Sequence, residues 1–345
     1  MSIIRVLAAI ATMSLGSIPA IGASFDCSKA GTPFEHAICD VPELSRADEI
    51  LAKAFATATG GLTEQSVTMM RQDQRDWLNY ARRVCTDDAQ PLTSGRYDDE
   101  AAACLLDKFN GRVAALEQSR MITGHRFLIT SSYEAMPDPD EVGNPDSYWK
   151  VASYESVRPL LDADDPLAEQ FNAFVTEQAD GAEANQEGDL AARDGRADHT
   201  GKVEIQEVVG NKRISMMETN YYFPHGAAHG GSMITYLHYL VDEERSLVAS
   251  DIFTGADWEK RLADLAWAQL QAEHQEWLQV ESVADIAEIV VDPARWSFSD
   301  DYGLTIQFNQ YEVAAYAYGA PTITIAWDRL SGITSDMQSA ISSGL

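Results

Sequence analysis

Four cysteines, confined to the first third of the chain, constrain the fold of this 345-residue sequence more than any other feature. They are Cys27, Cys39, Cys85 and Cys104. In an exported chain, an even number of cysteines within one short region is typical of a small domain stabilised by disulfides. Zinc is the competing interpretation, but zinc sites use closely spaced ligand pairs and the sequence has no Cys-x-x-Cys pair. The sequence therefore predicts two disulfides in an N-terminal domain, without a metal.

The first 23 residues show the pattern of a secretory signal peptide. Arg5 provides a positive start, residues 6–18 are apolar apart from three polar residues, and small residues gather at positions 20, 22 and 23. The apolar run is short for a membrane span, which needs about 20 residues. We therefore expect cleavage near Gly22 or Ala23. The mature protein should be periplasmic or secreted, with no membrane segment left after cleavage.

The chain is strongly acidic, with a formal net charge of −29. Residues 24–120 carry 11 Lys/Arg and 16 Asp/Glu, a net charge of −5, whereas residues 121–345 carry 13 and 38, a net charge of −25. Such a surface repels nucleic acid and anionic lipid, and it speeds the encounter with a cationic partner. Solubility or growth in salty water would produce the same composition, and the sequence does not separate these explanations.

The N-terminal region has the spacing of a helical hairpin. Apolar residues repeat at helical intervals over residues 33–60 and 62–119, apart from a loop over residues 86–97. Cys85 ends one helix and Cys104 lies near the start of the next, so a Cys85–Cys104 bridge would close this loop and leave Cys27 to pair with Cys39. The other two pairings remain possible. A hairpin of this size is too small for a large core, which explains the disulfides.

From about residue 126 the pattern changes to strands that alternate with helices. The expected strands cover residues 126–132, 202–223, 233–241 and 322–327, and a hairpin is expected over residues 295–308. The expected helices cover residues 167–178 and 257–277, and the polar stretch 179–201 is expected to be a long loop. The sequence thus predicts an α+β fold: a disulfide-stabilised helical domain (24–120), then a larger domain (121–345) with helices packed on a mostly antiparallel sheet.

The N-terminal region resembles the LprI-type lysozyme-inhibitor family over roughly residues 25–118. The residues that carry the resemblance are Phe25-Asp26-Cys27, Glu35, Ala37-Ile38-Cys39, Leu44, Asp48, Gln74-Arg75, Trp77-Leu78, Arg82, Cys85 and Cys104-Leu105. One extra residue stands between Arg82 and Cys85 compared with the usual family pattern. The resemblance implies that the partner of this domain is a lysozyme.

The C-terminal region resembles the extracytoplasmic domain of the RsiV-type anti-sigma factor over about residues 125–330. The resemblance is carried by Tyr221 to Gly231, Asp251-Ile252-Phe253, Trp258, Phe308, Tyr311 to Ala314, Tyr316 and Gly319. Gly230 and Ala315 stand where the family usually has proline. In the anti-sigma factor this domain binds lysozyme, so the resemblance implies the same partner for both regions.

The segment His225-Gly226-Ala227-Ala228-His229 is the first candidate site. Two histidines four residues apart bind a metal when the segment is helical. However, Pro224 and the neighbouring glycines favour a loop, and no acidic third ligand lies nearby in the sequence. We expect His225, Gly226 and His229 either to contact a protein partner or to form a structural turn between strands.

Three tyrosines form the second candidate site, and they are Tyr311, Tyr316 and Tyr318. Tyrosine offers a large, rigid contact area, which suits a protein interface, although core packing is the alternative. Catalytic motifs are weak by comparison. The sequence has no Gly-x-Ser-x-Gly, and the pair Asp300-Asp301 is typical of a turn.

Together these features predict a protein without catalytic activity or cofactor that binds and inhibits a lysozyme-type muramidase by occluding its cleft. Animal-type lysozymes are basic, so an acidic inhibitor would be steered towards them. The alternative is a module that recognises peptidoglycan or an endogenous wall enzyme. A third possibility is an unrecognised hydrolase, which would use His225. The sequence does not predict the oligomeric state.

Overall fold

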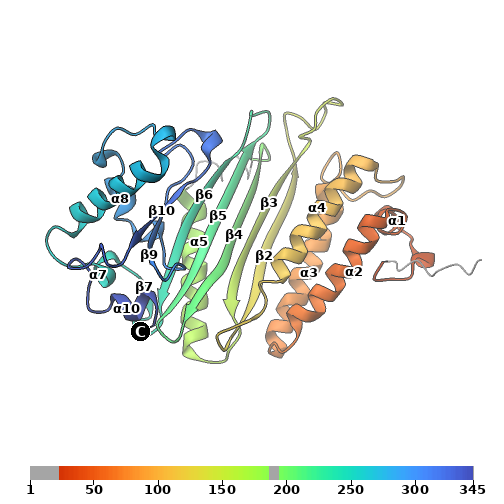
Figure 1. The fold of residues 1–345 in the computed structure, drawn as a ribbon. Coiled ribbons are helices and arrows are strands. Elements are labelled where there is room, and N and C mark those ends of the chain that lie inside the picture. Colours follow the sequence, from red (N-terminus) through yellow and green to blue (C-terminus); the bar gives the residue numbers. More distant parts are fainter. Residues whose placement is uncertain (1–22, 186–193, 345) are drawn as a thin grey trace, which may run out of the picture.

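The computed structural model describes residues 23–185 and 194–344, and the predicted signal peptide lies outside these residues apart from Ala23. A helical region, a seven-stranded sheet and a smaller C-terminal unit follow one another across the molecule (Figure 1). No helix within the described ranges is both long and apolar enough to span a bilayer.

Four α-helices make up the N-terminal region, after the 3₁₀ turn η1 (Cys27–Lys29). They are α1 (Pro33–Asp40), α2 (Pro42–Thr59), α3 (Glu64–Val84) and α4 (Asp99–Leu116). Their starts follow local signals. Thr32 and Glu35 form a reciprocal capping box at α1, and the side chains of Thr63 and Asp98 cap α3 and α4.

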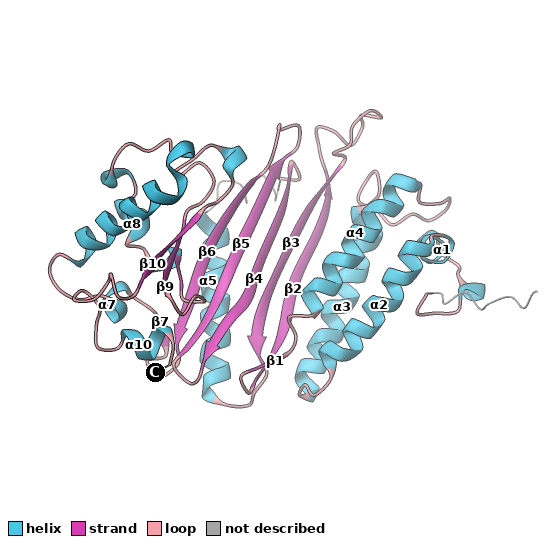
Figure 2. Ribbon diagram, viewed as in Figure 1, coloured by secondary structure: helices cyan, strands magenta, loops and turns pink. Residues whose placement is uncertain are grey.

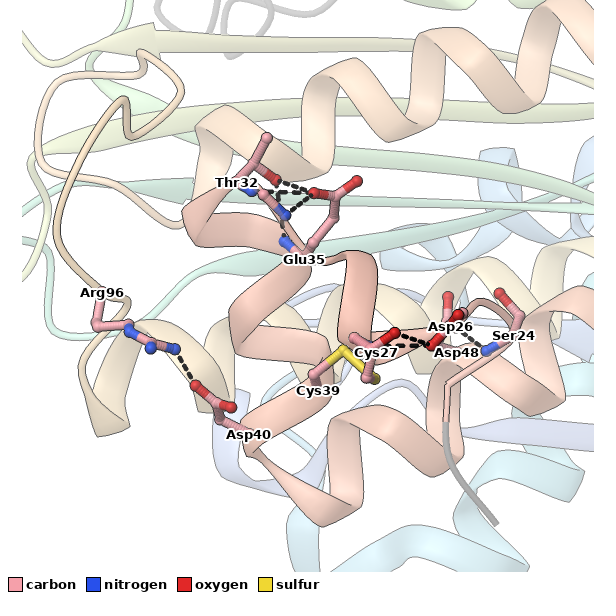
Figure 3. Close-up of a disulfide and its surroundings, with 11 residues drawn as sticks. Ser24, Asp26, Cys27, Thr32, Glu35, Cys39, Asp40, Asp48 and Arg96 are labelled. Atoms are coloured by element: carbon pink, nitrogen blue, oxygen red, sulfur yellow. Dashed lines mark hydrogen bonds and ion pairs between the residues drawn. A yellow bond between two sulfur atoms is a disulfide. The ribbon is translucent and has the colours of Figure 1, made fainter. Parts of the chain in front are cut away.

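Two disulfides hold the ends of these helices. Cys27 bonds to Cys39 and so ties η1 to α1 (Figure 3), while Cys85 bonds to Cys104 and closes the loop between α3 and α4. The pairing that the helix positions favoured is confirmed. A bridge that closes a loop reduces the conformational entropy of the unfolded chain, which stabilises the folded state.

The large sheet contains seven strands in the order of the sequence, and every neighbouring pair is antiparallel except β3 and β4 (Figure 2). The strands are β1 (Met121–Ile122), β2 (His125–Pro137), β3 (Val151–Leu161), β4 (Ala197–Val209), β5 (Arg213–Pro224), β6 (Gly231–Leu240) and β7 (Arg245–Ser246). Helix α5 (Pro166–Asn185) makes the parallel crossover and packs behind the sheet (Figure 1). The α+β class predicted from the sequence is confirmed.

The strand register brings several loops to one end of the sheet. Pro137 pairs with Val151, Ala197 with Pro224, and Tyr222 with Gly231. The β2–β3 loop, the start of β4 and the β5–β6 loop therefore meet at this end, which we call the loop end of the sheet. It carries the segment around His225 and His229.

The C-terminal unit has its own three-stranded antiparallel sheet, in the order β10-β9-β8. Its elements are α7 (Ala249–Ile252), α8 (Trp258–His274), η2 (Gln275–Trp277), η3 (Val283–Asp285), α9 (Ala287–Val290), η4 (Pro293–Arg295), β8 (Trp296–Ser297), β9 (Gly303–Gln307), η5 (Tyr316–Tyr318), β10 (Thr322–Ala326) and α10 (Gln338–Ser342). The predicted hairpin around residues 300–303 joins β8 and β9. This unit packs beside β6 around Trp296 and Phe253, both fully buried.

The N-terminal helices share their hydrophobic core with the large sheet. Leu105 and Phe109 of α4 belong to the same hydrophobic cluster as Leu128 and Ile129 of β2. The predicted division at residue 120 stays a prediction, and the apolar core continues across it.

Polar contacts at this junction are equally extensive. Arg112 of α4 has a fully buried side chain that forms an ion pair with Asp73 of α3. The same guanidinium donates to Gln74 Oε1 at 2.9 Å and to Tyr133 Oη at 3.0 Å, which joins both helices to β2. Asp162, just after β3, accepts hydrogen bonds of 2.7 Å from the hydroxyls of Thr63 and Ser66 at the start of α3.

Three element predictions need correction. The sequence did not predict strand β3, because Glu155 and Arg158 interrupt its apolar pattern. In the structure, Glu155 accepts a hydrogen bond from Tyr80 of α3 and forms an ion pair with Lys108 of α4. Residues 202–223 are two strands, β4 and β5, rather than one. The long loop predicted over 179–201 is also wrong at both ends, since α5 continues to Asn185 and β4 begins at Ala197; its middle, residues 186–193, lies outside the described residues.

Replacing Asp73 by alanine should test the helix–sheet junction. The variant leaves the buried guanidinium of Arg112 without its carboxylate, so we expect the free energy of unfolding to fall by about 3–5 kcal/mol. Urea titration of the oxidised protein measures this. As a control, Glu49→Ala removes the half-buried partner of the exposed Lys53 and should cost no more than about 1 kcal/mol. Equal losses in the two variants would contradict this account.

Candidate functional site

Four ring side chains gather where the β5–β6 loop meets the segment after β9, and we call them the aromatic site. They are Tyr221, His229, Tyr311 and Tyr316. Two hydrogen bonds from backbone amides of strand β6 to side chains bring the segments together. Ser232 N donates to Gln310 Oε1 at 2.9 Å, and Ile234 N donates to Asn309 Oδ1 at 2.8 Å. The structure thus brings His229 of the first candidate site into contact with Tyr311 and Tyr316 of the second.

An ion pair fixes the segment that carries the tyrosines. Arg295 donates to both carboxylate oxygens of Glu312, at 2.6 and 3.1 Å, and Asn309 N donates to Glu312 Oε2 at 2.6 Å. A two-point arginine–carboxylate contact restricts orientation as well as distance. Tyr311, next to Glu312, is therefore presented from a rigid base.

His229 lies at the centre of the aromatic site. Its ring stacks on Tyr316, with ring centroids 3.8 Å apart and an interplanar angle of 18°. His229 Nδ1 donates to the carbonyl of Gly230 at 2.9 Å, so in the neutral ring Nε2 is the acceptor that faces Tyr311 Oη at 3.3 Å. These contacts hold three rings in fixed relative positions.

Two glycines shape the loop around His229. Gly226 has a φ of +79°, which residues with a side chain seldom adopt. Gly230 is buried, and a Cβ there would lie 2.5 Å from Tyr221 Oη and 2.6 Å from the carbonyl of Tyr222. No larger residue fits at Gly230 without moving Tyr221, so the loop and the ring depend on each other.

The outer rings of the aromatic site face solvent. Tyr311 is 61% exposed and Tyr221 is 38% exposed, whereas Tyr316 is half-buried beneath them. Partial burial, together with Tyr316 and Asp198 nearby, raises the pKa of Tyr221. Its hydroxyl therefore remains protonated at neutral pH. An exposed, pre-ordered set of tyrosine rings suits contact with another molecule.

His225 does not join the aromatic site. Its side chain is only 3% exposed and lies between two carboxylates: Nδ1 is 2.6 Å from Asp138 Oδ2, and Nε2 is 3.7 Å from Asp198 Oδ1. The acidic neighbours that were missing from the local sequence come from β4 and the β2–β3 loop. His225 is therefore buried rather than presented at the surface, and its partners are distant in the sequence.

The carboxylates control the charge of His225. Burial lowers the pKa of His225, but Asp198 and Asp138 outweigh it, so the pKa lies above its usual value. Burial likewise raises the pKa of Asp198, but His225 and two bonds from Ser153, at 2.7 and 2.8 Å, outweigh it and hold the pKa below its usual value. At mildly acidic pH, protonated His225 and ionised Asp198 therefore form an ion pair.

Tyr318, also in η5, belongs to a second group of rings, together with Trp277 and His274. It stacks on Trp277, with centroids 5.1 Å apart and an interplanar angle of 21°, and its hydroxyl donates to His274 Nδ1 at 2.6 Å. Trp277 and His274 were not predicted as site residues from the sequence. Both end the predicted helix 257–277, and nothing in the local pattern indicates that they would meet Tyr318.

The part of the chain that the structure describes contains no cluster of three histidine, cysteine or acidic side chains arranged to hold a metal. The aromatic site itself offers hydroxyl and imidazole groups in mutual contact, together with exposed ring surface. Such groups can bind and orient a partner through hydrogen bonds and ring contacts.

Comparison with known families matches both ends of the chain. The model of the family described as "Lysozyme inhibitor LprI" matches residues 26–116, and that described as "Protein of unknown function (DUF3298)" matches residues 250–328. The protein thus contains an LprI domain and a DUF3298 domain, the family to which RsiV-type extracytoplasmic domains belong. Both resemblances are confirmed, although the second match covers the C-terminal unit and not the large sheet. No curated protein matches the chain.

Two solved structures are similar to this chain. A member of the DUF3298 family from Bacteroides fragilis has 18% sequence identity and a TM-score of 0.45, and the match covers 64% of this chain and 98% of that one. A DUF3298 family protein from Pseudomonas aeruginosa has 17% identity and a TM-score of 0.42, with 62% and 96% covered.

The raised pKa of His225 predicts a pH-dependent contribution to stability. The protonated histidine stabilises the fold fully below its unfolded pKa of about 6.5, and this contribution is lost as the pH rises through the higher folded pKa. His225→Gln should therefore lower the free energy of unfolding by about 2 kcal/mol at pH 5.5 and by much less at pH 9. Urea titrations at both pH values measure the difference.

Asp138→Asn provides a matched variant for this test. It leaves His225 in place but removes one of the two carboxylates that raise the pKa of the histidine. The free energy of unfolding of this variant should depend less on pH than that of the wild type, as expected for His225→Gln. An equal loss of stability at both pH values in His225→Gln would refute the charged-histidine account.

Tyr311 combines exposure with an unusual backbone conformation, since its φ is +68°. A residue with a side chain pays about 1 kcal/mol or more for this left-handed region, whereas glycine does not. We therefore expect Tyr311→Gly to be more stable than Tyr311→Ala by about 1 kcal/mol in thermal or urea unfolding. If the two variants have the same stability, the backbone at this position is not strained.

Proposed function

We propose that this protein binds a lysozyme-type muramidase outside the cytoplasm and inhibits it by occluding the substrate cleft. The observation that carries the proposal is the presence of an LprI lysozyme-inhibitor domain at residues 26–116. It is joined in one chain to a domain of the family that includes RsiV-type extracytoplasmic domains. Such inhibition needs no catalytic group in the inhibitor; it needs a surface that fills the cleft of the partner.

The aromatic site supplies a suitable surface. Tyr311 and Tyr221 project ring area into solvent from positions held by His229, Tyr316 and the Arg295–Glu312 ion pair. Rigid aromatic side chains lose little conformational entropy on binding, so they often contribute most of the affinity of an interface. We therefore assign the main contact to Tyr311, Tyr316 and His229, with Gly226 shaping the loop.

The charge distribution supports a basic partner. A cleft of about 500 Å³ opens between the loop closed by the Cys85–Cys104 disulfide and the β2–β3 loop, at the loop end of the sheet. Its charged lining residues are Asp87, Asp98, Glu100, Asp146 and Lys150. Acidic groups from the N-terminal helical region and from the β2–β3 loop thus line one cleft, which favours electrostatic steering of a cationic protein.

The proposed location follows from the predicted signal peptide and from the two disulfides. Disulfides form and persist in oxidising compartments outside the cytoplasm, where a muramidase would be met. The same compartment would hold the cell wall, the ligand of the alternative wall-binding module. The strongly acidic surface is unfavourable for binding anionic wall polymers directly, so we prefer the protein partner.

Titration of the full-length mature, oxidised protein against an animal-type lysozyme tests the proposal. We expect loss of lytic activity in a turbidity assay. The association rate should fall by about tenfold or more between low and high salt, because steering by charge is screened. Tyr311→Gly and Tyr311→Ala should both weaken binding by about tenfold or more, whichever of them is more stable.

Tyr302→Ala is the matched control. Tyr302 is 70% exposed and lies in the β8–β9 turn, at the opposite end of β9 from the aromatic site. Its replacement should leave binding unchanged. Strong retention of the protein on purified sacculi, without any effect on lysozyme, would instead favour the wall-binding module. Absence of lysozyme binding even at low salt would overturn the proposal.

A further inference from the structure

Trp277 is an exposed aromatic residue that neither the family comparisons nor the predicted site explains. It is 55% exposed at the end of η2, although a tryptophan of a monomeric protein is usually highly buried. Its indole stacks on Tyr318, and the hydroxyl of Tyr318 donates a hydrogen bond to His274 Nδ1, which fixes the tyrosine ring. His274 Nε2 donates to the carbonyl of Thr322 at 3.0 Å. The exposed indole is therefore held in position by contacts that reach strand β10.

Trp277 is continuous with the aromatic site. Leu278, the next residue, forms a β-bridge with Ala314, and Gln279 N donates to Val313 O at 2.9 Å. This pairing places the end of η2 beside the segment that carries Tyr311 and η5. Within η5, Tyr316 stacks on His229 while Tyr318 stacks on Trp277. The two groups of rings are thus joined through a single short helix.

The surroundings of Trp277 are acidic. The 33-residue stretch 262–294 contains seven acidic residues and no lysine or arginine. Three of the acidic residues, Glu273, Glu276 and Glu281, lie within four residues of Trp277 and are exposed. A neutral ligand would gain nothing from this charge, whereas a cation over the indole would be attracted both by the ring and by the carboxylates.

We propose that Trp277, backed by Tyr318, receives a cationic side chain of the protein partner, an arginine or a lysine, and so extends the contact surface of the aromatic site. The inference rests on the proposed function and adds an anchor residue and the chemistry of the group it binds. The indole is the strongest aromatic acceptor for a cation, and tryptophan is enriched among residues that dominate interfaces. Because the ring is already fixed by Tyr318, little entropy is lost when it is covered.

Binding of an animal-type lysozyme to the full-length oxidised protein tests this assignment. Trp277→Ala should raise Kd by about 30-fold. Trp277→Leu keeps apolar volume but has no aromatic face, and it should raise Kd by a similar factor. Glu276→Gln combined with Glu281→Gln should slow association severalfold at low salt and have little effect at high salt. Tyr302→Ala is the control and should change Kd by less than about twofold.

The outcomes separate this inference from the function on which it rests. If the wild-type protein binds lysozyme and Trp277→Ala changes Kd by less than twofold, the anchor assignment is wrong while the proposed function stands. If Trp277→Leu binds like the wild type, the contact is apolar and the cationic group is wrong. If Trp277→Ala instead abolishes retention on sacculi with lysozyme affinity unchanged, the indole binds glycan. If the wild type does not bind lysozyme, the proposed function fails and the inference falls with it.

Discussion

The buried guanidinium of Arg112 joins the two halves of the molecule, and the arrangement of the loops depends on it. Its desolvation is offset by Asp73 and by bonds to Gln74 and Tyr133, which come from both sides of the junction. An unpaired buried charge is costly, so helices α3 and α4 have one favourable position against β2. That position places the loop closed by Cys85–Cys104 next to the β2–β3 loop, where both line one cleft.

Polar side chains also determine the position of the aromatic site. Asn309 and Gln310 bond to backbone amides of β6, which lies more than 70 residues earlier, and Glu312 is held by Arg295. Tyr311 sits beside these anchors in a left-handed backbone conformation that glycine would adopt more easily. Strain of this kind persists where surrounding contacts fix the conformation, and it is found most often at binding sites.

The proposed role requires no catalytic chemistry from these residues; it requires that they are held in fixed positions. An inhibitor that fills a cleft gains affinity from rings that are already ordered, while long-range attraction between opposite charges raises the rate of encounter. The protein combines both features, because its fixed rings lie on a chain with a large excess of acidic residues. His225 contributes differently: as a buried ion pair with Asp138 and Asp198, it stabilises the base of the loop that presents His229.

The sequence by itself determined the elements whose signals are local. The helices follow from apolar periodicity and capping residues such as Thr32 and Asp98. The positions where those helices begin and end favoured the observed disulfide pairing but left the other two pairings possible. Family resemblance was also readable, since it rests on short motifs. Strand β3 was missed because the partners of Glu155 come from distant helices. In the same way, only tertiary packing buried His225 between Asp138 and Asp198 and brought Trp277 against Tyr318. Each of these contacts joins residues more than 20 positions apart, where periodicity and local spacing carry no information about distance in space.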